Sequence, residues 1–91
     1  MTKSELIEAV AKRSDITLDR ATTVVNALFD HMIEAMKRGE RIEVRNFGNF
    51  VVKEYEGYEG RNPKSGEKVQ VPPKRLPFFK SGLGLRKMLN S

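Results

Sequence analysis

The chain contains no cysteine and no tryptophan, and it has a single histidine. Without cysteine, neither a disulfide framework nor a thiolate metal site can stabilise the fold, so we expect a cytoplasmic protein. His31 has no cysteine or second histidine to work with, which favours a surface or packing role over a metal site. No nucleophile with an acid–base partner and no phosphate-binding glycine loop is evident. We therefore expect no catalysis, no cofactor and no small-molecule substrate.

Long apolar runs are also missing from the chain. No segment approaches the ~20 consecutive apolar residues of a membrane span, so we expect no membrane partner. At 91 residues the chain can bury only a thin core, and chains of this size often gain stability by pairing with a second copy. We therefore expect a single domain over residues 1–91 that forms a dimer.

The formal net charge is +5, and it is unevenly placed along the chain. Residues 1–40 hold six basic against seven acidic side chains, whereas residues 41–91 hold eleven against five. The positive charge is most concentrated between Gly60 and Lys80. Such one-sided charge indicates a polyanionic partner, of which nucleic acid is the commonest, although an anionic membrane surface would also suit it.

The first forty residues have the periodicity of two helices. A capping box beginning at Thr2 opens a helix over about residues 3–13. Thr17 is the expected N-cap of a second helix over about residues 18–38, which Gly39 can close. The apolar side chains of this second helix cover more than one stripe, which predicts burial on two sides, one of them against a partner chain.

From Arg41 the period changes from helical to alternating. Residues 41–45 read as a strand with one buried face, residues 46–49 as a tight turn, and Phe50 begins the next strand. That strand runs on towards a second turn at residues 62–66, beyond which residues 68–71 return.

About eleven residues on each side of the second turn make a hairpin over about 30 Å long at ~3.3 Å per residue. A body of this size cannot cover such a hairpin, so its outer half should project into solvent and be mobile until something binds it. If the turn is centred near Lys64, Glu54 lies opposite Lys74. Tyr55 and Tyr58, three residues apart, should point to opposite faces of the strand, so that at most one can stack on a base.

The predicted fold class is therefore α+β. It comprises a two-helix dimerisation base over residues 1–40 and a three-stranded antiparallel sheet from residue 41. A protruding β-hairpin arm over about residues 53–76 extends from this sheet. Residues 76–79 return to apolar character and should rejoin the body, and Ser81 is the expected cap of a short last helix.

Four segments carry a family resemblance. They are ELIEAVA at 5–11, GERIEVRNFGNF at 39–50, GRNPKSGEKV at 60–69, and the ending formed by Pro77, Phe79 and Lys80. In this order and spacing the chain resembles the bacterial histone-like DNA-bending family, the HU and integration host factor proteins. The resemblance implies an intertwined dimer of the bacterial nucleoid, either a homodimer or a heterodimer with a paralogue. Its helices form a base, its sheets form a saddle, and its two arms enter the minor groove of double-stranded DNA.

The resemblance also assigns roles to individual residues. Pro63 at the arm tip is the expected intercalating wedge, with Arg61 and Asn62 beside it in the minor groove, because a rigid apolar ring without an N–H can open a stacked base step. The expected phosphate contacts are Lys3, Lys53, Lys64, Lys68, Lys74, Arg75, Lys80, Arg86 and Lys87. The expected dimer-core aromatics are Phe29, Phe47, Phe50 and Phe79.

The chain departs from the family pattern in two places. Lys53 is the only base between residues 53 and 60, against Glu54, Glu56 and Glu59, which should weaken phosphate attraction on that strand. Residues 81–84 lack a base that the family has beside the last helix, which puts phosphate contacts there in doubt.

The strand at residues 41–45 looks more like the integration host factor β subunit than like HU. Glu43 and Arg45 are its candidate pair for reading the shape of the minor groove. The chain is thus expected to bend or compact DNA mainly without sequence preference. The alternatives are a sequence-preferring subunit like that of the host factor, and an RNA-binding or protein-interaction scaffold.

Overall fold

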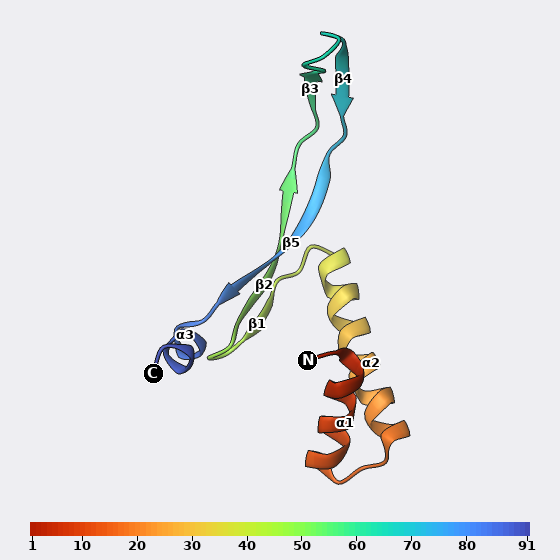
Figure 1. Cartoon of the computed structure of the whole chain (residues 1–91), viewed down its shortest axis with the longest axis vertical. Helices are drawn as coiled ribbons and strands as arrows, with labels where there is room; N and C mark the ends of the chain where they lie inside the picture. The colour runs from red at the N-terminus through yellow and green to blue at the C-terminus, as the bar shows by residue number, and fades with distance from the viewer. The chain divides into compact units, whose positions relative to one another are not determined.

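The computed structural model describes all 91 residues, which fall into two compact units, Met1–Ala35 and Met36–Ser91. The first unit is built from α1 (Lys3–Ser14) and most of α2 (Leu18–Lys37), which form a helical hairpin (Figure 1). The hydroxyl of Thr2 accepts from the Glu5 amide at 3.2 Å, which confirms the predicted cap of the first helix. None of the three helices of the chain is both long enough and apolar enough to cross a bilayer.

The core of the first unit is small. Only Ala21, Val25 and Ala35 are buried apolar residues, whereas Val24, Leu28 and Ile33 of α2 are about half exposed. Soluble proteins rarely leave a helix with so broad an apolar surface uncovered. This surface is what a helix that packs against a second chain requires.

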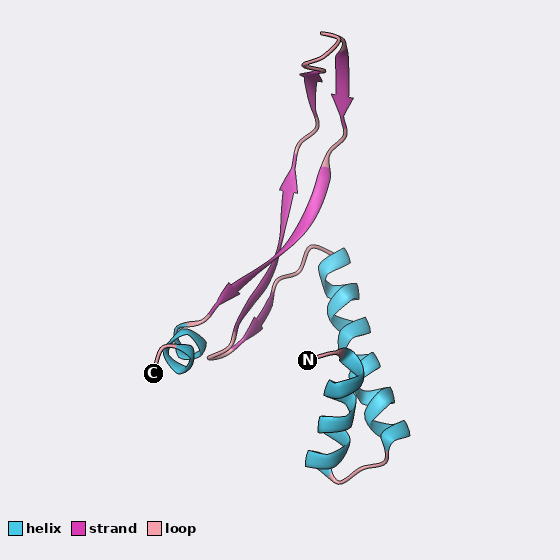
Figure 2. Ribbon diagram, in the orientation of Figure 1, coloured by secondary structure: helices cyan, strands magenta, loops and turns pink.

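The second unit contains the predicted three-stranded antiparallel sheet, which the structure confirms. Its strands are β1 (Ile42–Val44), β2 (Gly48–Tyr55) and β5 (Lys74–Ser81), in the order β1-β2-β5 (Figure 2). In the same unit, α3 (Leu83–Leu89) follows β5.

The turn between β1 and β2 was predicted too late in the chain. It spans residues 45–47, is closed by a 3.0 Å bond from the Phe47 amide to the Val44 carbonyl, and has Asn46 at a positive φ of 67°. Gly48 is already part of β2 and is buried against β5: a Cβ there would lie 2.5 Å from the Lys80 carbonyl oxygen. Glycine at this position serves close strand approach rather than the turn.

The arm is divided into two halves. Beyond β2 and β5, a separate two-stranded sheet is formed by β3 (Tyr58–Arg61) and β4 (Lys68–Val71). We call residues 58–71 the outer ribbon and the paired part of β2 and β5 the inner sheet. Between them the unpaired segments 56–57 and 72–73 face each other, and we call this place the joint. Residues 72 and 73 are prolines, which have no N–H to donate to a ladder.

The pairing register is the same on both sides of the joint. Tyr55 pairs with Lys74, and three residues further along each strand Tyr58 pairs with Val71. At the tip, the Asn62 amide donates to the Glu67 carbonyl at 2.9 Å, which encloses the four-residue loop 63–66.

The turn is thus centred between Lys64 and Ser65, and not on Lys64. Glu54 consequently lies opposite Arg75, so the expected pairing of Glu54 with Lys74 is wrong by one residue. Because side chains alternate along a strand, this one-residue shift exchanges the faces of Lys74 and Arg75.

The expected cap of the last helix is also corrected. Ser81 is the last residue of β5 and lies opposite Gly48, while Gly82 occupies the N-cap of α3 without a side-chain hydrogen bond. The Gly82 amide instead donates to the Phe47 carbonyl at 2.8 Å, which ties the start of α3 to the turn after β1.

Candidate nucleic-acid interface

The inner sheet has two chemically different faces. Because successive residues of a strand point to opposite sides, the register of β2 and β5 sorts their side chains. The lysine face carries Lys53, Lys74 and Lys80, three of the predicted phosphate contacts. The aromatic face carries Phe50 and Phe79, two of the predicted dimer-core residues.

Two of the three lysines on the lysine face lie over aromatic rings. The Nζ of Lys53 lies 4.3 Å from the ring centroid of Phe78, and the Nζ of Lys74 lies 5.7 Å from that of Tyr55. A cation above a ring face is attracted by the ring quadrupole, which orients the ammonium group without neutralising it. These two lysines can therefore present a full positive charge to a phosphate.

The aromatic face is held together by ring contacts but is poorly covered. The ring centroid of Phe79 lies 4.9 Å from that of Phe50 and 5.4 Å from that of Phe47. Even so, Phe79 is 43% exposed and Phe47 is 45% exposed. In the first unit, Phe29 borders a hollow of about 470 Å³ together with Leu6 and Ile33. These apolar surfaces are open in the single chain, as residues of a dimer core must be.

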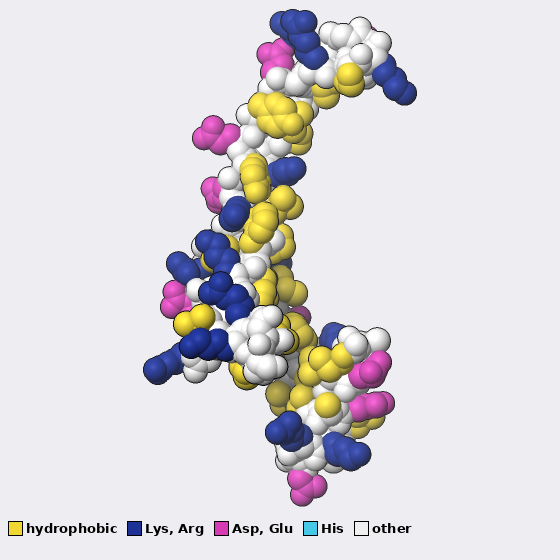
Figure 3. Space-filling model, turned by 60° about the vertical axis from the view of Figure 1, so that its left-hand side comes forward, with side chains coloured by type: hydrophobic (Ala, Val, Ile, Leu, Met, Phe, Trp, Pro, Cys, Tyr) yellow, Lys and Arg dark blue, Asp and Glu magenta, His cyan; other side chains and the backbone are white.

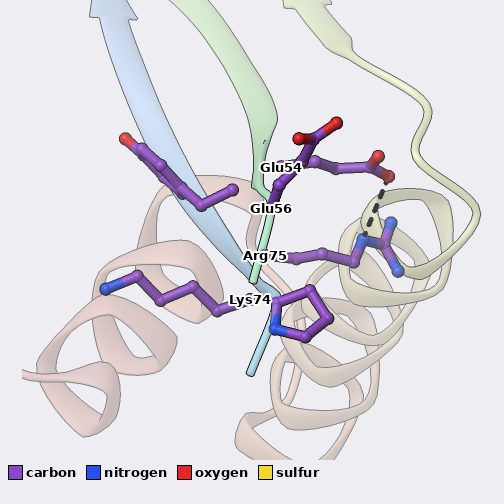
Figure 4. A pocket seen from close by; sticks show the side chains of 6 residues that line it. Glu54, Glu56, Lys74 and Arg75 are labelled. Carbon is purple, nitrogen blue, oxygen red and sulfur yellow. Dashed lines mark ion pairs between the residues drawn. The ribbon is translucent and has the colours of Figure 1, made fainter. Parts of the chain in front are cut away.

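Arg75 is placed differently from the lysines beside it. It projects from the aromatic face, opposite Glu54, and its guanidinium donates to the backbone carbonyls of Met36 and Lys37 at 3.0 Å each. Its Nε lies 3.7 Å from a carboxylate oxygen of Glu54, and Figure 4 shows the two side chains directed toward each other. A phosphate would therefore have to compete with these protein groups for the guanidinium of Arg75, which was predicted to be a phosphate contact.

A cluster of three polar side chains, Arg41, Glu43 and Asn49, lies at the other end of the lysine face. Of these, the sequence predicted only Glu43 as a site residue. Glu43 pairs with Asn49 across the strands, and its carboxylate lies 3.2 Å from Nε of Arg41. With the Asn49 amide turned so that its oxygen faces Arg41, that oxygen accepts from Nη2 at 3.0 Å. Arg45, the predicted partner of Glu43, lies in the exposed turn after β1. Because residues 41, 43 and 45 alternate along the strand onto one face, the sequence could have indicated Arg41 as a third member of this site.

The outer ribbon again has two faces. Arg61 and Lys68 form a cross-strand pair on its polar face, where Glu59 lies 3.7 Å from the Nζ of Lys68. The opposite face carries the side chains of Tyr58, Val69 and Val71. Two of the three acidic side chains that depart from the family pattern, Glu54 and Glu59, are thus paired with bases of the arm. Figure 3 shows Lys and Arg side chains at the tip and over the sheet, with hydrophobic side chains along the arm between them.

Pro63 is the first residue of the four-residue tip loop. The side-chain oxygen of Asn62 accepts from the Lys64 amide at 2.9 Å, and the Gly66 amide donates to the Asn62 carbonyl at 2.8 Å. Asn62 therefore shapes the turn around Pro63. Pro63 and Arg61 are both exposed.

Tyr55 and Tyr58 do not separate as the strand alternation predicted. Both border a hollow of about 440 Å³ at the joint, together with Pro72 and Leu76. Strict alternation requires one uninterrupted strand, but the pairing stops at residues 56–57. The expectation that at most one of the two rings can meet DNA is therefore not supported.

The remaining predicted contacts lie on helices. Lys3 is the first residue of α1 in the first unit, and Arg86 and Lys87 lie in the last turn of α3 in the second unit. No group of three or more metal-ligating side chains is present in the structure.

A sheet with a lysine-lined face that continues into a proline-tipped β-ribbon belongs to the class of β-ribbon DNA-binding proteins. Residues 1–90 match the family model described as bacterial DNA-binding protein, and the chain belongs to this family. The members of this family are architectural DNA-binding proteins and not enzymes, and neither is this chain an enzyme.

Individual relatives agree with this assignment. The chain is 42% identical over 86 residues to DNA-binding protein HU 1 of Bacillus subtilis, covering 94% of each. It is 48% identical over 92 residues to the integration host factor subunit beta of Nitrosomonas europaea, covering 100% of this chain and 88% of that protein. An Anabaena HU–DNA cocrystal structure matches with a TM-score of 0.81 and 37% identity, covering 98% and 97% of the two chains. HU from Thermotoga maritima, at 24% identity and a TM-score of 0.70, shares the fold over 98% of both chains.

Proposed function

We propose that this chain, as a dimer, is an architectural protein that binds the minor groove of duplex DNA and bends or compacts it, mainly without sequence preference. The structure of the arm carries the proposal. Its two strands keep one pairing register from the lysine face to the exposed tip that holds Pro63. A proline wedge opens a base step at little conformational cost to itself, and the bent duplex then meets more of the basic surface. The similar HU chain that was crystallised with DNA supports this choice of ligand.

The dimer is proposed from the uncovered apolar surfaces of α2 and of the aromatic face. Residues 1–91 act as one histone-like domain, in which residues 1–40 provide the dimerisation base. A homodimer is the proposed form, and a heterodimer with a paralogue is the alternative, since one relative is named as the beta subunit of a factor. Binding to the bacterial chromosome would place the protein in the cytoplasm, in the nucleoid.

The phosphate contacts that we propose lie along the arm and the lysine face. They are Lys53, Lys64, Lys68, Lys74 and Lys80, with Lys3, Arg86 and Lys87 as flanking contacts when DNA bends round the sides. Each lysine that neutralises a phosphate releases a counterion, so the affinity should fall as the salt concentration rises.

Two measurements on one duplex test the proposal. Across a salt series, the logarithm of the binding constant should fall linearly with the logarithm of the salt concentration. End-to-end FRET on the same duplex should rise with bound protein, and Pro63→Ala should reduce this rise more than it reduces the affinity. A flat salt dependence would contradict DNA binding, and unchanged FRET in Pro63→Ala would contradict the wedge.

A sequence-preferring role is the second candidate, and the group formed by Arg41, Glu43 and Asn49 favours it. A carboxylate and an amide that hold an arginine in place can make binding depend on the width of the groove. Competition between random duplexes and a site selected from a random pool separates the two roles, because a ratio near one excludes sequence preference. A structured RNA that competes as well as DNA would instead support an RNA-binding role.

A further inference from the structure

Arg75 and Lys74 are neighbours in β5 whose side chains leave opposite faces of the strand. Lys74 lies beside the ring of Tyr55 on the lysine face, and Arg75 lies opposite Glu54 on the aromatic face. Figure 4 shows Lys74 directed away from Arg75 and Glu54. Two adjacent cations of the same strand therefore meet different surroundings.

The surroundings of Arg75 are those of a helix cap. The carbonyl oxygens of Met36 and Lys37 belong to the end of α2, where the last carbonyls of a helix have no amide partner inside it. Nη1 of Arg75 donates to the Lys37 carbonyl and Nη2 to the Met36 carbonyl, both at 3.0 Å. The negative end of the helix dipole lies at the same place and favours a cation there.

The shape of the guanidinium matters for this arrangement. Its planar fork offers two donors in a fixed geometry, which a lysine ammonium at the end of a flexible chain does not reproduce. The third group, Nε, faces Glu54 at 3.7 Å. All three nitrogens of Arg75 thus have partners within the protein, and a phosphate would have to displace at least one of them.

We infer that Arg75 is a positioning residue that joins the inner sheet, at the root of the arm, to the last residues of α2, and that it does not bind phosphate. The consequence of this positioning role for DNA bending rests on the proposed function: when the root of the arm is held in place, the tip meets the duplex at a defined angle. The connection to α2 itself exists without DNA.

The DNA-free test uses amide hydrogen exchange and NMR of the folded protein. Gly39 is the reporter, because its amide donates at 3.0 Å to the same Met36 carbonyl that accepts from Arg75. Arg75→Ala should speed exchange at Gly39 by about three- to tenfold, since it removes charge-assisted bonds from a partly exposed site. Arg75→Lys, which keeps the charge but loses the fork, should fail to restore the protection. Unchanged exchange at Gly39 in both variants would overturn the inference.

The DNA test compares Arg75→Ala with Lys74→Ala, a matched control one residue away. Lys74→Ala should lower the salt slope by about one, as expected for one lost phosphate contact. Arg75→Ala should leave the slope unchanged and should lower the FRET of the saturated complex. A slope that falls by about one in Arg75→Ala would show a phosphate contact and refute the positioning role.

The two proposals fail in distinguishable ways. If the wild-type protein shows no salt-dependent duplex binding, the proposed function fails, while exchange at Gly39 still decides the role of Arg75. If Arg75→Ala does not fold, Arg75→Lys carries the test: a phosphate contact predicts wild-type exchange at Gly39 and a wild-type slope, whereas a positioning role predicts faster exchange with a wild-type slope.

Discussion

The inner sheet and the outer ribbon belong to one hairpin with one pairing register, yet they are supported very differently. The inner sheet has a third strand, a cluster of aromatic rings and the contact of Arg75 with the end of α2. The outer ribbon has two strands, four pairs of residues and an exposed ion pair. Backbone pairing alone leaves a two-stranded ribbon marginally stable. Because of this difference in support, the outer ribbon can open locally while the inner sheet stays folded.

The largest expected contrast comes from the same substitution in the two halves. In Gly48→Ala the new Cβ would lie 2.5 Å from the Lys80 carbonyl oxygen and 2.6 Å from the Phe79 ring, so the inner sheet must shift. We expect the free energy of unfolding to fall by about 3 kcal/mol. In Gly60→Ala the nearest atom to the new Cβ lies at 3.6 Å, an ordinary contact, and we expect a change within about 0.5 kcal/mol.

Urea denaturation at one fixed protein concentration measures both variants, because the stability of a dimer depends on concentration. Equal losses in the two variants would mean that the outer ribbon is packed as tightly as the inner sheet.

A second contrast removes an aromatic ring from each half. Phe79→Ala takes away the ring that contacts both Phe47 and Phe50. Because Phe79 lies in the aromatic face that the proposed dimer covers, we expect a loss of about 3 kcal/mol, as for the removal of a buried ring. Tyr58→Ala, at a residue 64% exposed, should change the stability by less than about 0.5 kcal/mol. A loss for Phe79→Ala well below the cost of a buried ring would contradict the burial of the aromatic face by a partner chain.

Much of this architecture could be predicted from local signals. Caps at Thr2 and Thr17, and a glycine at positive φ at residue 39, marked the helices, and both threonine hydroxyls accept the expected amides. The alternating strands predicted the sheet, and the charge imbalance indicated where a polyanion would bind. These signals depend on residues that are close in sequence.

The parts that could not be predicted depend on longer distances or on one residue of register. Whether the tip loop has an odd or even number of residues decides if Lys74 or Arg75 lies opposite Glu54, and the sequence permits either. The hydrogen bonds of Arg75 to Met36 and Lys37 join residues almost forty positions apart, which no local pattern encodes. Both tyrosines border one hollow because of the gap at the joint. Prolines at 72 and 73 cannot donate ladder hydrogen bonds, but they do not by themselves encode that residues 56–57 of the opposite strand also leave the pairing.

A third contrast concerns the joint. Gly57 packs so closely there that a Cβ would lie 2.8 Å from the Val71 carbonyl oxygen and 3.0 Å from Pro73. Gly57→Ala should therefore open the joint while costing less than about 1 kcal/mol of global stability, because little of the core is involved. Amide exchange in β3 and β4 should rise by several fold, and exchange in the inner sheet should stay unchanged. A matching rise in β2 and β5 would show that the arm opens as one unit, and Gly60→Ala again serves as the control without a clash.

The smallest expected effect concerns the acidic side chains of the arm. Glu59→Gln removes the carboxylate 3.7 Å from Lys68, an exposed pair, so we expect less than about 0.5 kcal/mol of change in stability. The affinity for duplex DNA should nevertheless rise by about two- to threefold at low salt, because Lys68 no longer has a competitor for phosphate, and the gain should shrink as salt screens the charges. Glu56→Gln makes the same change of charge at the joint, away from Lys68. If both variants raise the affinity equally, net charge alone explains the effect; a larger gain in Glu59→Gln would show that the acid of the outer ribbon restrains its own lysine until DNA replaces it.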